Sequence, residues 1–117
     1  MLEFYITNAE NKFIKLDNMM KGCWVNMVNP TDDEIQQVAD RFNIAVDYFK
    51  DALDDDERSR IENEENFLCI IVDFPYITHD EAGFPIYETI PIGILIAEDA
   101  FITVSLKETP ILEDFKN

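Results

Sequence analysis

The sequence predicts an α/β (α+β) domain with a mixed, largely antiparallel sheet and helices packed on its faces. Three observations support this fold class. Short runs of β-forming residues open the chain, two helical segments follow within residues 31–53, and apolar strand-like runs occupy residues 67–106. The 117 residues are enough for one domain, and 47% of them are apolar, so the chain can bury a core.

The first elements are three short strands. Residues 2–7 and 12–16 are rich in β-formers and are separated by a polar turn, which predicts a hairpin. Residues 23–28 (CWVNMV) alternate, so Cys23, Val25 and Met27 are expected on one face of a third strand.

Two helices follow. Pro30 disfavours helix before it, and Thr31 with Glu34 three residues later forms a capping box, which predicts a helix over residues 31–42. A second, shorter helix is expected over residues 45–53. Both have apolar residues at helical spacing, so each is expected to pack on a sheet.

The second half of the chain predicts a meander. Residues 67–74 (FLCIIVDF) are expected to form a buried central strand that ends near Pro75. Residues 86–97 predict the next strand, in which Pro91 indicates a bulge or an unpaired edge near its start. Residues 100–106 complete the antiparallel meander.

Composition excludes several classes of function. The chain has 25 acidic residues against 9 Lys and Arg, a net charge of -16 that repels nucleic-acid phosphates. Cys23 and Cys69 lie far apart in apolar runs and His79 is the only histidine, which indicates reduced core thiols of a cytosolic protein rather than a zinc site. No nucleophile with a neighbouring base and no phosphate loop is present, so we expect no enzymatic activity.

No stretch reaches the ~18 to 20 apolar residues of a membrane span, and the start of the chain does not resemble a signal peptide, so residues 1–117 are expected to form a single soluble domain.

Residues 47–65 are the most informative segment for function. They contain nine carboxylates and three cations, so mutual repulsion must be relieved by solvent, salt or a bound cation. A solvated acidic rim is one interpretation. A calcium-binding EF-hand loop beginning at Asp54 is rejected, because Arg58 and Ser59 occupy positions that need an oxygen ligand and a glycine.

A magnesium site is the other interpretation. Asp47, Asp51 and Asp54 have i, i+4, i+7 spacing on the exposed face of the second predicted helix, and Asp55 adjoins them. Magnesium takes one or two carboxylates and keeps most of its water, so a hydrated ion could connect one of these groups to another surface.

At this point the order of the motifs resembles a known family. Residues 24–77 and 87–110 resemble the N-terminal cytoplasmic domain of CorA-like magnesium transporters. The matching pieces, in chain order, are Trp24, Pro30-Thr31, Phe42-Asn43-Ile44, Asp51-Ala52-Leu53, Arg60-Ile61-Glu62, Phe67–Phe74 and Thr103–Glu108.

The resemblance implies a regulatory role. In such transporters the domain lies on the cytoplasmic side of the cell membrane in a homopentamer and is joined through a stalk helix to two membrane spans. The family's Asp-x-Leu acid, here Asp51, takes part in a regulatory magnesium site between subunits, whereas Lys50 stands where relatives often have an acid. The chain would then be a fragment truncated before the stalk helix. Thr109 and Pro110 predict the start of another helix, with Ile111, Leu112 and Phe115 as its apolar face. A soluble acidic protein-interaction module without a metal role remains the alternative function.

Overall fold

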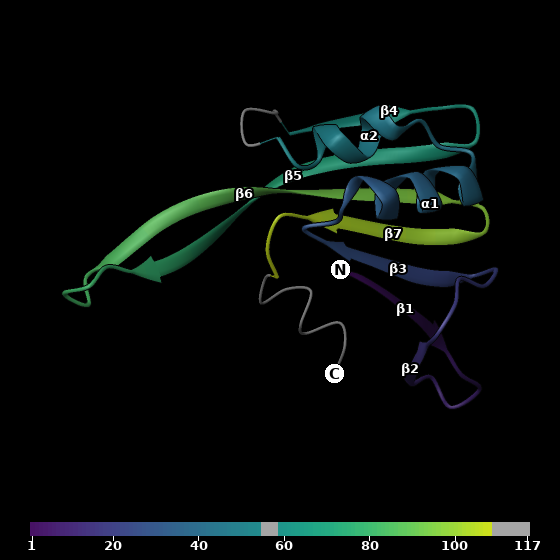
Figure 1. The fold of residues 1–117 in the computed structure, drawn as a ribbon, viewed down its shortest axis with the longest axis horizontal. Helices are drawn as coiled ribbons and strands as arrows, with labels where there is room; N and C mark the ends of the chain where they lie inside the picture. Colours follow the sequence, from purple (N-terminus) through teal and green to yellow (C-terminus); the bar gives the residue numbers. More distant parts are fainter. Residues whose placement is uncertain (55–58, 109–117) are drawn as a thin grey trace.

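The computed structural model describes residues 1–54 and 59–108, which form one seven-stranded sheet with two helices over one face (Figure 1). Five of the six strand pairs are antiparallel, and β3 and β7 form the parallel pair of this described sheet. The mixed, largely antiparallel sheet is therefore confirmed. Across the sheet, the strands are β2 (Phe13–Leu16), β1 (Leu2–Thr7), β3 (Cys23–Val28), β7 (Ala100–Ser105), β6 (Pro85–Ala97), β5 (Phe67–His79) and β4 (Arg60–Asn63).

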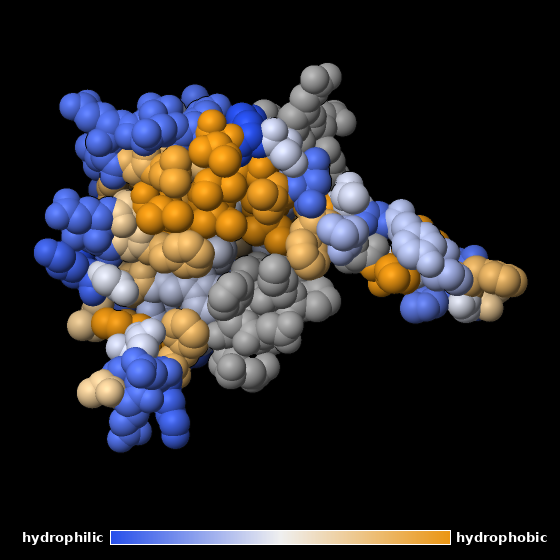
Figure 2. All heavy atoms as spheres, turned by 180° about the vertical axis from the view of Figure 1, so that it is seen from behind, coloured by the Kyte–Doolittle hydropathy of each residue, from blue (hydrophilic) through white to orange (hydrophobic). Residues whose placement is uncertain are grey.

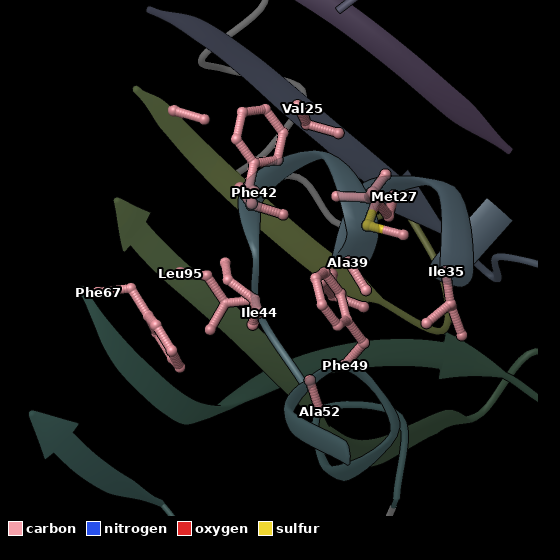
Figure 3. Packing of buried hydrophobic residues seen from close by; sticks show 14 of the residues in the cluster. Val25, Met27, Ile35, Ala39, Phe42, Ile44, Phe49, Ala52, Phe67 and Leu95 are labelled. Carbon is pink, nitrogen blue, oxygen red and sulfur yellow. The ribbon is translucent and has the colours of Figure 1, made fainter. Parts of the chain in front are cut away.

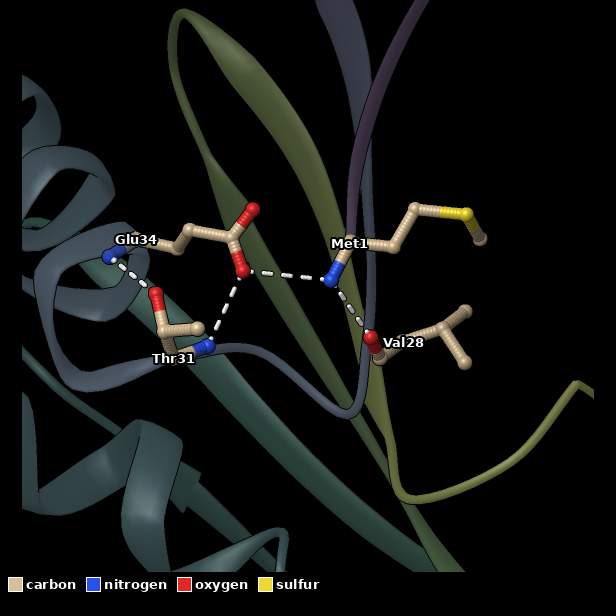
Figure 4. A network of polar contacts seen from close by, with 4 residues as sticks. All are labelled: Met1, Val28, Thr31 and Glu34. Carbon is tan, nitrogen blue, oxygen red and sulfur yellow. Dashed lines mark hydrogen bonds and ion pairs between the residues drawn. The ribbon is translucent and has the colours of Figure 1, made fainter.

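Helix α1 (Asp32–Phe42) begins at the predicted capping box. The Thr31 hydroxyl accepts a hydrogen bond from the Glu34 amide at 3.1 Å, and the Glu34 carboxylate accepts one from the Thr31 amide at 2.9 Å (Figure 4). The amino group of Met1 also donates to Glu34, at 3.1 Å, and to the carbonyl of Val28, at 2.8 Å. These contacts, the Thr31 backbone bond first, lower the pKa of Glu34. The chain start, the end of β3 and the start of α1 are thereby held together.

The hydrophobic core lies between the helices and the sheet. Side chains of α1 and of the second helix, α2 (Val46–Asp51), point at alternate residues of the central strands (Figure 3). Phe49 is fully buried and anchors α2 in this layer. Gly93 of β6 permits the close approach of α2, because a Cβ at residue 93 would overlap that of Ala52. Gly93 and Ala52 therefore allow the end of α2 to pack directly on β6.

Both described helices lie on the same face of the sheet, so the expectation of helices on its faces holds for one face within residues 1–54 and 59–108. On the opposite face, apolar side chains gather over the middle of the sheet (Figure 2). Val72, Ile96 and Phe101 remain 38 to 40% exposed there. The sheet is thus apolar on both sides over part of its area.

A buried polar network crosses this second face. The Trp24 indole donates a hydrogen bond to the Thr103 hydroxyl at 2.9 Å, and that hydroxyl donates to the Asn26 side-chain oxygen at 2.9 Å. Asn26 is fully buried and Thr103 is 2% exposed. The network spans the parallel pair β3–β7 and matches its register, in which Asn26 stands opposite Thr103.

Strands β5 and β6 differ from their predicted bounds. The predicted end near Pro75 is wrong, because β5 continues to His79 and pairs with β6 without interruption from Phe67 to its end. β5 is also next to the edge strand β4 and not central. The bulge considered near Pro91 does not occur in this register, whereas the unpaired edge does, since pairing with β7 begins only at Ile92. The outer halves of β5 and β6 therefore extend beyond the sheet as a two-stranded arm (Figure 1).

Candidate metal-binding surface

Helix α2 presents two of the predicted acids to solvent. Because Phe49 points into the core, Asp47 and Asp51, one turn apart, lie on the outer side of the helix, where Asp47 is exposed and the Asp51 side chain is 41% exposed. The helix ends at Asp51, so Asp54 lies beyond it and does not continue the predicted i+7 face, although it is exposed. Asp55 lies outside the described residues.

Asp47 and Asp51 line the same surface pocket as a third carboxylate, which comes from another element. Together with Ala45 and Tyr48 of the α2 segment, they and Glu62 of β4 line a surface pocket of about 250 Å³, large enough for several water molecules. Glu62 was not among the acids predicted from the sequence to bind a metal. The residues of β4 alternate in the sequence, and in the structure they alternate between half-buried and exposed. That alternation predicts a strand, but the position of Glu62 beside α2 depends on the tertiary fold.

Arg60 supplies the positive charge at this surface. Its Nη2 atom lies 2.8 Å from Asp51 Oδ2, and its Nε atom lies 2.7 Å from Glu62 Oε1. Burial alone would lower the pKa of Arg60, but the charges of Glu62 and Asp51 outweigh burial and raise it. Lys50 stands where the resemblance leads us to expect an acid. It is exposed, and the described residues show no ion pair for it. The cation in contact with Asp51 is therefore Arg60.

Tyr48 closes one side of the pocket. A hydrogen bond to the Glu64 carboxylate, with burial and the charges of Glu64 and Glu62, raises the pKa of Tyr48 to about 12. Its ring packs edge-on against Phe67, with 4.9 Å between ring centroids. Tyr48 thus stays protonated at neutral pH and contributes a neutral oxygen to the surface.

The donor atoms suit a hard cation but do not complete a site. Carboxylate oxygens are the ligands that magnesium prefers, and magnesium binds few protein groups because it retains water. Within residues 1–54 and 59–108, no group of three or more His, Cys, Asp and Glu side chains is placed to hold a metal ion. A metal at Asp51 would therefore need water or ligands from outside this part of the chain.

The two thiols do not provide another reactive site. Cys23 and Cys69 are free and buried, as predicted for reduced core residues. Burial, followed by the charge of Glu62, raises the pKa of Cys69 to about 11. Its thiolate form is therefore scarce at neutral pH.

In the part of the chain described here, no helix has the length and apolar character required to cross a membrane.

A family model and a curated relative both match this chain, and both are CorA proteins. Residues 20–117 match the family described as CorA-like Mg²⁺ transporter protein. A curated relative, the cobalt/magnesium transport protein CorA of Methanocaldococcus jannaschii, is 27% identical over 81 residues, which make up 69% of this chain and 24% of the relative.

Two solved structures share the fold. The complete structure of the CorA magnesium transporter from Methanocaldococcus jannaschii aligns with a TM-score of 0.74, and the structure of its soluble domain aligns with 0.76, each at 20% identity. Both alignments cover 98% of this chain but only 35% and 44% of the matched chains, so this chain spans less than half of each. Because the family match extends over most of its length, the chain belongs to the CorA-like Mg²⁺ transporter family.

Proposed function

We propose that this chain is the magnesium-sensing, regulatory domain of a CorA-like transporter, on the cytoplasmic side of the membrane and without enzymatic activity of its own. In this proposal the parent protein is a homopentamer whose membrane spans lie outside these residues. Magnesium bound between neighbouring subunits at Asp51 favours the closed state, so a high internal magnesium concentration stops influx.

The observation that carries this proposal is the convergence of Asp47, Asp51 and Glu62 on one surface pocket. Three carboxylates beside one guanidinium leave a local excess of negative charge. If such a surface faces a second acidic surface, the two repel one another, and a dication between them relieves that repulsion. A metal that binds only the closed arrangement then shifts the population toward it.

The incomplete donor set supports a site shared between subunits. Asp51 is partly exposed and accessible from solvent, yet the described chain supplies no third ligand placed around it. The 117-residue chain alone should therefore bind magnesium weakly, through one or two carboxylates and water. Calorimetric titration that gave tight binding at one site in this chain would contradict a shared site.

Transport by the full-length protein tests the regulatory role. Asp51→Asn removes the charge while keeping the shape, so transport should persist while the internal magnesium concentration needed for shut-off rises about tenfold. Asp40→Asn is the matched control, because Asp40 is an exposed acid of α1 that bonds Gln36 away from the pocket. Shut-off at the same magnesium concentration in Asp51→Asn and wild type would remove Asp51 from the regulatory site.

A further inference from the structure

Arg60 contacts the same carboxylates that a dication at the proposed metal site would bind. Its guanidinium contacts Asp51 of α2 and Glu62 of β4, and both carboxylates line the pocket of about 250 Å³. The Arg60 side chain is only 24% exposed, so it is held between these two elements and does not extend into solvent. A positive charge therefore already occupies the interior side of the proposed metal surface.

Two properties of this contact oppose metal binding. The guanidinium is permanently charged and its planar fork matches carboxylate oxygens, so it competes for the same atoms as a metal. It is also tethered in the same chain, so it needs no association from solution and is always present at the site.

We propose that Arg60 is a built-in competitor of the divalent cation for the Asp51 carboxylate and sets the magnesium concentration at which the site fills. This inference rests on the proposed function, because it assumes that a dication binds at Asp51. A dication must either displace Arg60 from Asp51 Oδ2 or bind beside it against repulsion from the like charge. In both cases the site fills at a higher magnesium concentration than it would if its carboxylates had no contact with Arg60.

The direct contact distinguishes Arg60 from Lys50. Lys50 precedes Asp51 in α2, but the described residues show it exposed and without an ion pair. Its ammonium is a hydrated point charge on a flexible stem, so solvent and salt screen it more strongly. Arg60 and Lys50 therefore form a matched pair: each carries one positive charge near Asp51, and only Arg60 holds its carboxylate.

Manganese binding to the 117-residue chain tests the proposal, with Mn²⁺ as a paramagnetic probe that takes the same oxygen ligands as magnesium. Binding is measured by water-proton relaxation, and folding of each variant is checked by circular dichroism and thermal melting. Arg60→Gln should tighten Mn²⁺ binding about tenfold, the change that one elementary charge makes to a dication several ångström away in water. Lys50→Gln should change it less than about threefold.

Two further variants separate the possible failures. Arg60→Lys keeps the charge without the fork, so it should bind Mn²⁺ between wild type and Arg60→Gln, and it serves if the Gln variant does not fold. Affinity no tighter than wild type in whichever variant folds, or an equal gain in Lys50→Gln, would overturn the role of Arg60. If adding Asp51→Asn to Arg60→Gln leaves Mn²⁺ binding unchanged, the metal is not at Asp51 and the proposed function itself fails. If that addition abolishes binding while Arg60→Gln alone has no effect, only the competition fails.

Discussion

Replacing Gly93 by alanine should destabilise the fold through one contact. A Cβ at residue 93 would lie well inside van der Waals distance of the Cβ of Ala52, which is 1% exposed and has no flexible atoms to move aside. The Val104 side chain, 3.8 Å from the new Cβ, limits movement in the other direction. Helix α2 must therefore shift away from β6. Forced overpacking of this kind costs about 2 kcal/mol of unfolding free energy.

Equilibrium unfolding in urea measures this cost, and Trp24 serves as the probe because it is the single tryptophan and is buried. The midpoint should fall by about 1 M urea. In the Ala52→Gly background the overlap is gone, so Gly93→Ala should cost less than about 0.5 kcal/mol there, and the double-mutant cycle should show a coupling of about 2 kcal/mol. Coupling below about 0.5 kcal/mol would refute the overlap as the reason for glycine at this position.

Three other perturbations test separate parts of the structure. Thr103→Val removes the hydroxyl that accepts from the Trp24 indole and donates to the buried Asn26 side-chain oxygen, so unfolding in urea should show a loss of about 2 to 3 kcal/mol; a loss under 1 kcal/mol would mean that these two bonds contribute little. The pKa of Glu34 is lowered by folding, so its stabilisation is present above the ordinary pKa of 4.5 and is lost as pH falls through the lowered value; the stability difference between wild type and Glu34→Gln should shrink below pH 4.5, and a difference independent of pH would contradict this. The pKa of Cys69 is about 11 against an ordinary 9.0, so alkylation at pH 8, located by mass spectrometry, should be at least about a hundredfold slower in the folded chain than in urea; equal rates would show that the thiol is accessible.

The fold was predictable where local chemistry decides it. The capping box of Thr31 and Glu34 depends on residues three apart, and it placed the start of α1 correctly. The prolines were harder to interpret. Pro75 lies beyond Ile71, the last residue of β5 toward that end that pairs with β4, and Pro91 directly precedes the start of pairing with β7. Proline is tolerated where no neighbouring strand needs its missing N–H, and the lengths of neighbouring strands are not encoded in the local sequence.

The candidate site was predictable only in part, for a similar reason. Helical spacing brought Asp47 and Asp51 together, because both lie within α2. The same spacing failed for Asp54, because α2 ends three residues earlier. Arg60 and Glu62 join the site from β4, and only the tertiary packing of that edge strand against α2 reveals the contact.

The parallel pairing of β3 with β7 also constrains how the chain folds during synthesis. Asn26 and Thr103 are hydrogen-bonded across 77 residues of sequence, so an inner strand of the sheet is made long before its partner. At a synthesis rate of 5 to 20 residues per second, β3 waits roughly 4 to 15 s with the backbone N–H and C=O groups of one edge unpaired and open to other nascent chains. The hairpin β1–β2, made first, covers the other edge during this interval. Completion of the sheet therefore depends on translation reaching Ser105, and contacts of such long range slow the final folding step.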